Sequence, residues 1–151
     1  MRIALFEPDI AGNVGAILRT AACFGADVDL IEPMGFAWSE RALARAGMDY
    51  VRDVTVRRHV DWDAFCASVD ARIVLFTTRG ATPLPQAHLL ADDILLFGSE
   101  SAGVPEAVHA RADARVLIPM RAGMRSLNIS VSVGIATAEA LRQTGGWPIA
   151  G

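Results

Sequence analysis

The sequence has no long hydrophobic run, and this shortage excludes a membrane-spanning protein. Its strongly apolar stretches, such as residues 94–97, have the length of a single strand, whereas a helix that crosses a membrane needs roughly 20 apolar residues. At the start of the chain, acidic residues follow a very short apolar stretch (Met-Arg-Ile-Ala-Leu-Phe-Glu-Pro-Asp), so we expect neither a signal peptide nor a transit peptide. We therefore predict a soluble, cytoplasmic protein.

Cysteine and histidine are also scarce. Cys23 and Cys66 are the only cysteines, and each lies within an apolar pattern far from the other. Buried thiols are therefore expected rather than a disulfide or a metal site. The three histidines are equally scattered, and no pair of these residues has the spacing of a zinc or haem motif. The sequence predicts no bound metal.

The chain lacks the excess of basic residues that phosphate binding normally requires. Its net charge is -3 and its pI is near 5.5, which argues mildly against nucleic acid as a partner. The arginines do gather locally, although the simplest interpretation of each is a solvated side chain. Those in question are Arg41, Arg45, Arg52, Arg57, Arg58 and Arg79 in the first half, and Arg121 and Arg125 on either side of a glycine.

The pattern of apolar residues predicts an α/β fold with a mainly parallel sheet flanked by helices. With 52% hydrophobic and 21% charged residues in 151, the chain suits one globular core. Its apolar period switches repeatedly between strand-like and helical spacing. Strands are expected at residues 3–6, 28–31, 54–57, 73–76, 94–97 and 116–118. Helices are expected at residues 14–24, 40–46, 62–69, 105–111 and about 127–143.

Local residues explain where these elements should begin and end. Gly25 and Gly47 stand where helices should stop, because glycine enters the left-handed conformation at little cost. Ser39 and Asp61 precede helices and are expected to cap them. A double glycine and a proline end the last helix. We expect a single domain over residues 1–144 and a tail over 145–151, in which Trp147 is either disordered or docked on the body.

Ligands of parallel α/β sheets bind beyond the carboxyl ends of the strands, and three loops there are unusual. The first, residues 7–20, contains two glycines at a helix start but neither a complete GxGxxG nor a P-loop. Within it, Asn13 suits a helix cap. Arg19 suits a surface ion pair, although its apolar neighbours indicate partial burial.

The second and third loops follow later strands. In residues 95–105, Gly98 and Gly103 suit a tight turn, but nothing structural requires the carboxylate of Glu100 between them. A site that binds a cation or a hydroxyl would use such a group. In residues 118–136, polar and apolar side chains alternate before a helix rich in small residues. This alternation fits either an extended strand or a segment in which serines and Gly134 allow close backbone packing.

Together the three loops resemble the three motifs of the knotted SPOUT class of RNA 2'-O-methyltransferases. These motifs are Asn-x-Gly with a downstream Arg (residues 13–19), Phe-Gly-x-Glu-x-x-Gly-Val-Pro (97–105), and Ile-Pro-Met (118–120) followed by Ser-Leu-Asn-Ile-Ser (126–130). The similarity spans almost the whole chain. Residues 31–38 (Ile-Glu-Pro-Met-Gly-Phe-Ala-Trp) and 46–50 (Ala-Gly-Met-Asp-Tyr) look in particular like the branch that methylates the ribose of the tRNA wobble nucleotide.

The resemblance implies a deep trefoil knot in the C-terminal half, S-adenosyl-L-methionine (SAM) as cofactor and the tRNA anticodon loop as substrate. It also implies a homodimer that pairs through its first and last helices. In such a pair, Arg41 and Arg45 of one chain would approach the site of the other. Small residues of the last helix, with Ile135 and Leu141, would supply the contact. The alternative is that the last helix is buried in the hydrophobic core of its own chain. The implied cofactor-binding residues are Phe76, Thr77, Gly98, Gly103, Ile118, Met120, Ser126 and Leu127.

By the same resemblance, Arg19, Asn13 and Glu100 form the catalytic set. A guanidinium is effectively always protonated, so Arg19 is expected to orient a phosphate or stabilise the developing alkoxide rather than act as a base. Asn13 and Glu100 would order the site, and methyl transfer would depend mainly on positioning. The sequence departs from the family at Ser99, Ser101 and Ala102, where relatives often have proline, threonine and arginine, and this affects RNA affinity or nucleotide choice.

Two alternatives remain open from the sequence. An enzyme of the same class could methylate another tRNA ribose or an rRNA ribose. A non-catalytic nucleotide-binding α/β module would explain the apolar period, the acidic pI and the glycine loops equally well. The module leaves the presence of both Arg19 and Glu100 unexplained.

Overall fold

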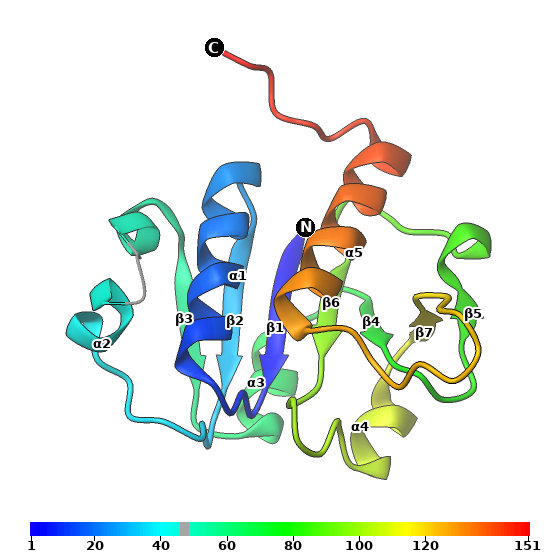
Figure 1. Cartoon of the computed structure of the whole chain (residues 1–151), viewed down its shortest axis with the longest axis horizontal. Helices are drawn as coiled ribbons and strands as arrows, with labels where there is room; N and C mark the ends of the chain where they lie inside the picture. Colours follow the sequence, from blue (N-terminus) through cyan, green and yellow to red (C-terminus); the bar gives the residue numbers. More distant parts are fainter. Residues whose placement is uncertain (46–48) are drawn as a thin grey trace.

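A parallel sheet forms the centre of the molecule. The computed structural model describes residues 1–45 and 49–151. Within these residues the sheet has seven strands in the order β3-β2-β1-β6-β4-β7-β5, and every neighbouring pair is parallel (Figure 1). The strands are β1 (Arg2–Phe6), β2 (Asp27–Ile31), β3 (Val56–His59), β4 (Ile73–Phe76), β5 (Thr82–Pro83), β6 (Ile94–Phe97) and β7 (Ala114–Leu117).

Helices cover both faces of this sheet. They are α1 (Ala11–Phe24), α2 (Glu40–Arg45), α3 (Trp62–Ser68), α4 (Glu106–Arg111) and α5 (Ile129–Thr144), with short 3-10 turns η1 (Asp49–Asp53) and η2 (Leu84–Gln86). The two longest, α1 and α5, lie side by side on one face (Figure 1). Phe65 of α3 and Val108 of α4 pack into the core of the other face. None of the helices in the described ranges is long and apolar enough to cross a membrane.

Alternation along the strands explains why they are apolar throughout. In β1, Ile3 and Leu5 pack under α1 and α5, whereas Ala4 and Phe6 point into the core of the opposite face. A strand buried on both faces has no polar side to show in its sequence. The expected α/β fold with a mainly parallel sheet is therefore confirmed, and β4 and β6 have the predicted bounds.

Other strands differ from the expected bounds. The third strand lies at Val56–His59 rather than at residues 54–57, and the last predicted strand lies at Ala114–Leu117 rather than at 116–118. β3 contains two exposed arginines and β7 contains one, and these polar residues interrupt the apolar pattern of each strand. The strand β5 was not predicted because two residues are too few to show a period.

Two helix starts were also misplaced. Helix α1 begins at Ala11, so Asn13 lies inside its first turn, and the predicted capping role of Asn13 is wrong; the N-cap, Ile10, makes no side-chain bond. Helix α5 begins at Ile129, and Asn128 caps it by accepting a hydrogen bond from the Ser130 N–H at 2.8 Å. The alternating residues after Asn128 are therefore helical rather than an extended strand.

The remaining boundary predictions mostly agree with the structure. Gly25 ends α1 in the left-handed conformation with φ 69°, and Asp61 caps α3 through the Ala64 N–H at 2.8 Å. The Ser39 hydroxyl accepts from the Ala42 N–H at 3.1 Å. The predicted end of the second helix at residue 46 and its stop at Gly47 lie outside the described residues.

The structure also shows how far the two thiols and the C-terminal tail are buried. Cys23 is exposed, contrary to expectation, because it lies on the outward side of α1. Cys66 is half-buried, and burial raises the pKa of its thiol. In the tail, the Trp147 ring meets Phe24 edge-on, with centroids 5.3 Å apart. Trp147 is therefore docked on the end of α1.

Candidate functional site

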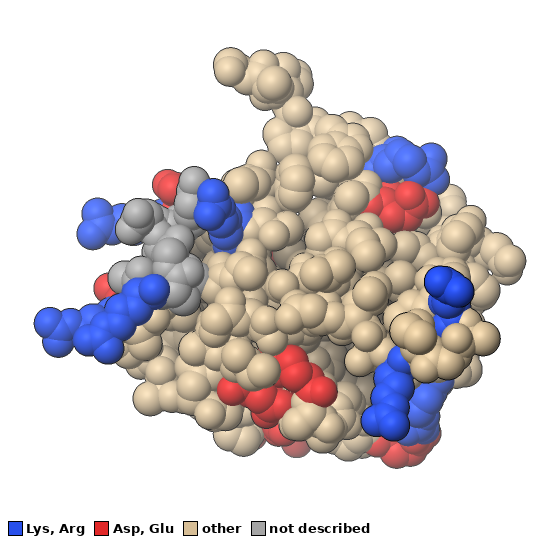
Figure 2. Space-filling model, in the orientation of Figure 1, with Lys and Arg blue, Asp and Glu red and all other residues tan. Residues whose placement is uncertain are grey.

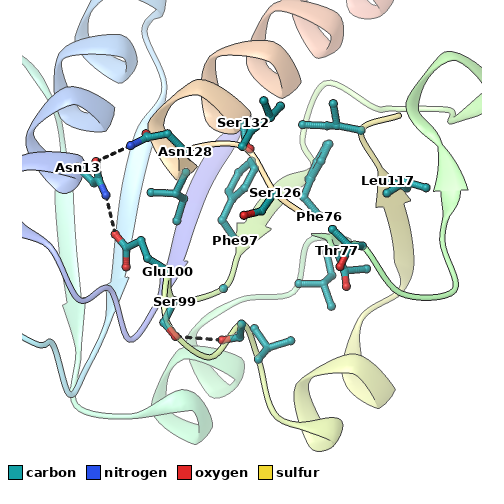
Figure 3. Close-up of a pocket in the computed structure, with 18 of the residues that line it drawn as sticks. Asn13, Phe76, Thr77, Phe97, Ser99, Glu100, Leu117, Ser126, Asn128 and Ser132 are labelled. Carbon is teal, nitrogen blue, oxygen red and sulfur yellow. Dashed lines mark hydrogen bonds between the residues drawn. The ribbon is translucent and has the colours of Figure 1, made fainter. Parts of the chain in front are cut away.

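A cavity of about 510 Å³ opens at the carboxyl ends of the central strands. Its walls come from the three loops that the sequence singled out, after β1, β6 and β7, and from the loop after β4 (Figure 3). The chain supplies these walls from residues more than 100 positions apart, because neighbouring parallel strands deliver their loops to the same edge of the sheet. This volume is in the range of small-molecule sites.

Two phenylalanines form the apolar floor of the cavity. Phe76 ends β4 and Phe97 ends β6, and the two residues are partners in the register of these strands. Their rings are stacked, with centroids 5.0 Å apart and planes at 15°. Both side chains are buried, so the floor is rigid and suits a flat aromatic ligand.

Backbone forms the wall after β6. Ser99 and Gly103 exchange two backbone hydrogen bonds of 3.0 and 2.9 Å, which close a tight turn. A Cβ at Gly98 would lie 2.6 Å from the Gly103 carbonyl carbon, and Gly103 itself has φ 64°. Gly98 leaves no room for a side chain, and the left-handed conformation of Gly103 favours glycine, so the wall presents peptide groups at these two positions.

A chain of hydrogen bonds joins the three loops at the rim of the cavity. Glu100 accepts from the Asp9 backbone N–H at 2.9 Å through Oε2 and from the Asn13 side-chain amide at 3.2 Å through Oε1. The amide oxygen of Asn13 accepts in turn from Asn128 Nδ2 at 3.2 Å (Figure 3). Each motif therefore contributes one polar side chain to a single network.

The loop after β7 closes the cavity on its other side. Ile118, Met120, Ser126 and Leu127 line it, and Ser132 of α5 adds a hydroxyl. All residues from Arg121 to Asn128 are exposed, and Gly123 turns the loop with φ 86°. Apolar side chains beside backbone and hydroxyl groups can cover the faces and bind the edges of a heteroaromatic ring.

The structure brings together ten of the eleven residues predicted for the site. Asn13 and Glu100 line the cavity, as do Phe76, Thr77, Gly98, Gly103, Ile118, Met120, Ser126 and Leu127. Arg19 is not among the lining residues. It lies six residues beyond Asn13, roughly 9 Å along α1, and its side chain is exposed, so the expected partial burial is wrong.

Sequence reasoning missed Asp9, whose carboxylate accepts two hydrogen bonds from Ser101. These bonds, the side-chain one first, hold the pKa of Asp9 below its usual range. Glu100 was singled out because it lies between two turn glycines, whereas Asp9 has no such flanks, and only its position in the loop after a buried strand could have indicated it. Among the residues that the structure describes, no three of the types His, Cys, Asp and Glu are grouped as a metal site would need.

Comparison with known families decides what the site belongs to. Residues 1–138 match the model of the SpoU rRNA Methylase family. The chain belongs to this family. The match includes all three loops around the cavity, so the family assignment and the geometry concern the same residues.

Relatives of this SpoU family member are similar along nearly their whole length. A tRNA (cytidine(34)-2'-O)-methyltransferase of Beijerinckia indica is 51% identical over 146 residues, which cover 95% of this chain and 91% of that protein. A solved structure described as giving insights into the 2-OH methylation of C/U34 on tRNA superposes with a TM-score of 0.89 at 43% identity, covering 94% of each chain.

A more distant structural neighbour contains the cofactor. The AdoMet-bound rRNA methyltransferase from Sinorhizobium meliloti has a TM-score of 0.85 at 27% identity, covering 93% of this chain and 55% of that one. The part of that protein that corresponds to this chain is therefore about half of its length. The SpoU fold is the element that the two proteins share.

Proposed function

We propose that this protein is a SAM-dependent tRNA 2'-O-methyltransferase that acts on the ribose of the wobble nucleotide, cytidine or uridine. The observation that carries the proposal is the cavity whose walls are the three family motifs, in a chain 51% identical to a tRNA (cytidine(34)-2'-O)-methyltransferase over 95% of its length. A tRNA substrate is found in the cytoplasm, and the proposed function therefore supports the expected cytoplasmic location.

SAM is the proposed occupant of the cavity, and when bound it supplies an electrophilic methyl group. The stacked Phe76 and Phe97 form an apolar floor, and Ile118 and Met120 add apolar cover. Peptide groups at Gly98, Gly103, Ser126 and Leu127 are suited to bind the edges of adenine. Thr77, at the end of β4, adds a hydroxyl at the same rim. This donor set fits a nucleoside better than a phosphate, since none of the described residues that line the cavity is cationic.

Asn13, Glu100 and Arg19 are the proposed catalytic residues. Asn13 and Glu100 order the rim, because Glu100 accepts hydrogen bonds from Asp9 and Asn13 of the first loop. Arg19 acts on the RNA side, where its guanidinium orients a phosphate or stabilises the alkoxide that forms as O2' loses its proton. Its place outside the cavity of its own chain agrees with a role toward RNA rather than toward adenine.

A homodimer through α1 and α5 is the proposed assembly. Val131 and Ile135 of α5 are 49% and 37% exposed, and Ile10 before α1 is 50% exposed. Among the residues that the structure describes, those in the middle of this face are neither basic nor acidic (Figure 2). Ala136 and Leu141, expected to supply dimer contact, are instead buried in the chain's own core. Light scattering tests the assembly, and an active monomer at assay concentration would contradict it.

The finer features of the fold belong to the same proposal. Residues 1–144 form one SPOUT domain with a tail at 145–151, and the segment after Ile118 threads under another loop to make the trefoil knot. Support comes from the TM-score of 0.89 to a relative that covers 94% of this chain. It also comes from the position of β4 between β6 and β7 in the sheet, since the last loop must return across the cavity to reach α5.

Methylation with labelled SAM on tRNA and on rRNA, followed by mapping of the modified nucleotide, tests the function. We expect label only in tRNA, on the ribose of the wobble nucleotide. Label in rRNA or at another tRNA ribose would favour the alternative substrates. SAM binding measured by calorimetry without RNA separates the enzyme from a non-catalytic module, and a folded protein that binds neither SAM nor its demethylated product would contradict the cofactor assignment.

A further inference from the structure

We propose that Asp9 is a positioning residue that fixes Glu100 and the turn around it at the rim of the cavity. The inference rests on the proposed methyltransferase function. Asp9 is not among the residues that line the cavity, and its carboxylate accepts hydrogen bonds from Ser101, so we expect it to act on the reaction through the residues that it holds.

The bonds between the two loops are reciprocal. The Asp9 backbone N–H donates to Glu100 Oε2 at 2.9 Å. In the opposite direction, the Ser101 N–H and hydroxyl both donate to Asp9 Oδ2, at 3.0 and 2.5 Å. Asp9 and the turn after β6 are therefore joined by three hydrogen bonds across 91 or 92 residues of sequence.

Asp9 is itself held from behind, so it can act as a fixed point. The Gly35 N–H donates to the Pro8 carbonyl at 2.9 Å. Gly35 packs so closely that a Cβ there would lie 2.8 Å from both Cα and O of Asp9. Glu7 has φ 44°, a conformation that is strained for a residue other than glycine and persists only where its surroundings enforce it.

This anchoring bears directly on Glu100. Its second oxygen is held by Asn13, so both carboxylate oxygens have donors only while the turn after β6 stays in place. The same turn carries Gly98 and Gly103, which form the backbone wall of the cavity. Loss of the Asp9 carboxylate releases Ser101 and lets Glu100 move away from Asn13. Such misplacement of about 1 Å can lower catalytic rates strongly.

A graded series of variants tests the proposal, because both Ser101 bonds end on one oxygen of Asp9. Asp9→Ala removes both bonds, and we expect kcat for tRNA methylation to fall about ten-fold while KM for tRNA and Kd for SAM stay within three-fold. Ser101→Ala removes only the hydroxyl bond, so a fall of about three-fold is expected. Asp9→Asn keeps one oxygen that can accept both bonds, and kcat should stay within about two-fold.

Asp61→Ala is the matched control, because Asp61 also accepts a backbone N–H but caps α3 away from the cavity. It should lower Tm about as much as Asp9→Ala and leave kcat unchanged. An Asp9→Ala enzyme with kcat within two-fold of wild type would overturn the proposal, and so would an Asp9→Asn enzyme as slow as Asp9→Ala. Wild-type protein inactive on tRNA would overturn the proposed function itself, whereas active wild type with unaffected variants would remove only the role of Asp9.

Discussion

The body of the parallel sheet and its carboxyl edge use polar residues in opposite ways. In the body, buried carboxylates are bound by basic side chains: Asp29, in the middle of β2, accepts from both Arg2 and His59, and Asp93, just before β6, accepts two bonds from Arg72. Both carboxylates have no exposed surface. At the carboxyl edge, the hydrogen bonds that join Asn13, Glu100 and Asn128 run between amides and a carboxylate, and this network borders an open cavity.

The difference separates stability from function within one sheet. Removal of one partner from a buried ion pair leaves a charge without compensation, which makes such pairs costly to break. Amides and a carboxylate at an open rim can replace a lost hydrogen bond with one to water or to a ligand. Substitution of these side chains should therefore lower activity more than it lowers the free energy of unfolding. The substitutions below test this division, from the largest expected effect to the smallest.

Arg19→Ala should produce the largest effect, a loss of roughly a hundred- to a thousand-fold in methyl transfer if its guanidinium stabilises charge on the RNA side. SAM affinity should change by no more than a few-fold, because Arg19 does not line the cavity. Single-turnover assays and calorimetry measure the two quantities. Arg19→Lys should restore little, since lysine lacks the planar fork; near-normal turnover by either variant would contradict this role.

In the body of the sheet, Asp29→Ala should cost about 3 kcal/mol of unfolding free energy, because it leaves Arg2 and the nearly buried His59 without their shared acceptor. Denaturant unfolding measures this loss, and SAM affinity of the folded fraction should be unchanged. Asp27→Ala is the control: it breaks the exposed pair with Arg57 and should cost less than about 1 kcal/mol. An equal loss of unfolding free energy in the two variants would contradict the proposed difference between buried and exposed ion pairs.

Gly98→Ala should weaken SAM binding about ten-fold or more, equivalent to about 1.4 kcal/mol. The added Cβ would lie 2.6 to 2.8 Å from the backbone of Gly103 and so push the cavity wall outward. Calorimetry with SAM gives the measurement. Gly12→Ala places its Cβ in open space and should bind SAM normally; if both variants bind equally well, the turn is not a wall of the cofactor site.

The smallest effect concerns pH. The pKa of Asp9 in the folded protein lies below its ordinary value of 3.8, because Ser101 donates to its carboxylate. Its contribution to stability is therefore complete above that value and is lost as pH falls through the lower, folded pKa. The difference in unfolding free energy between wild type and Asp9→Ala should shrink between pH 5 and pH 3. A difference that stays constant would mean that the carboxylate charge is not involved.

Much of the fold was predictable because the central strands are buried on both faces. β4 and β6 appear in the sequence as continuous apolar runs with the bounds they have in the structure. The prediction was less accurate where a buried face is mixed with arginines, as in β3, which was placed two residues too early. A local pattern also could not show that Cys23 lies on the outward side of α1.

The site was predictable as three loops but not as one network. The glycines and Glu100 stood out because their local geometry or charge had no structural explanation nearby. The bond from Asp9 to Glu100 joins residues 91 positions apart, and spacing in the sequence carries no trace of such a contact. The same reason explains why Arg19 was expected to be partly buried, since apolar neighbours along the chain do not reveal which side of a helix faces the core.

The pairing of β1 with β6 sets the order in which the protein can be completed during synthesis. Arg2 is the partner of Ile94, so one edge of β1 stays open while the ribosome makes the intervening chain, which takes roughly 5 to 20 seconds. The first three strands can already associate in that interval, with an apolar edge available to wrong partners. The cavity, which needs Asn128 from the last loop, forms only after this edge is closed, so the nascent chain acquires its binding site at the end of folding.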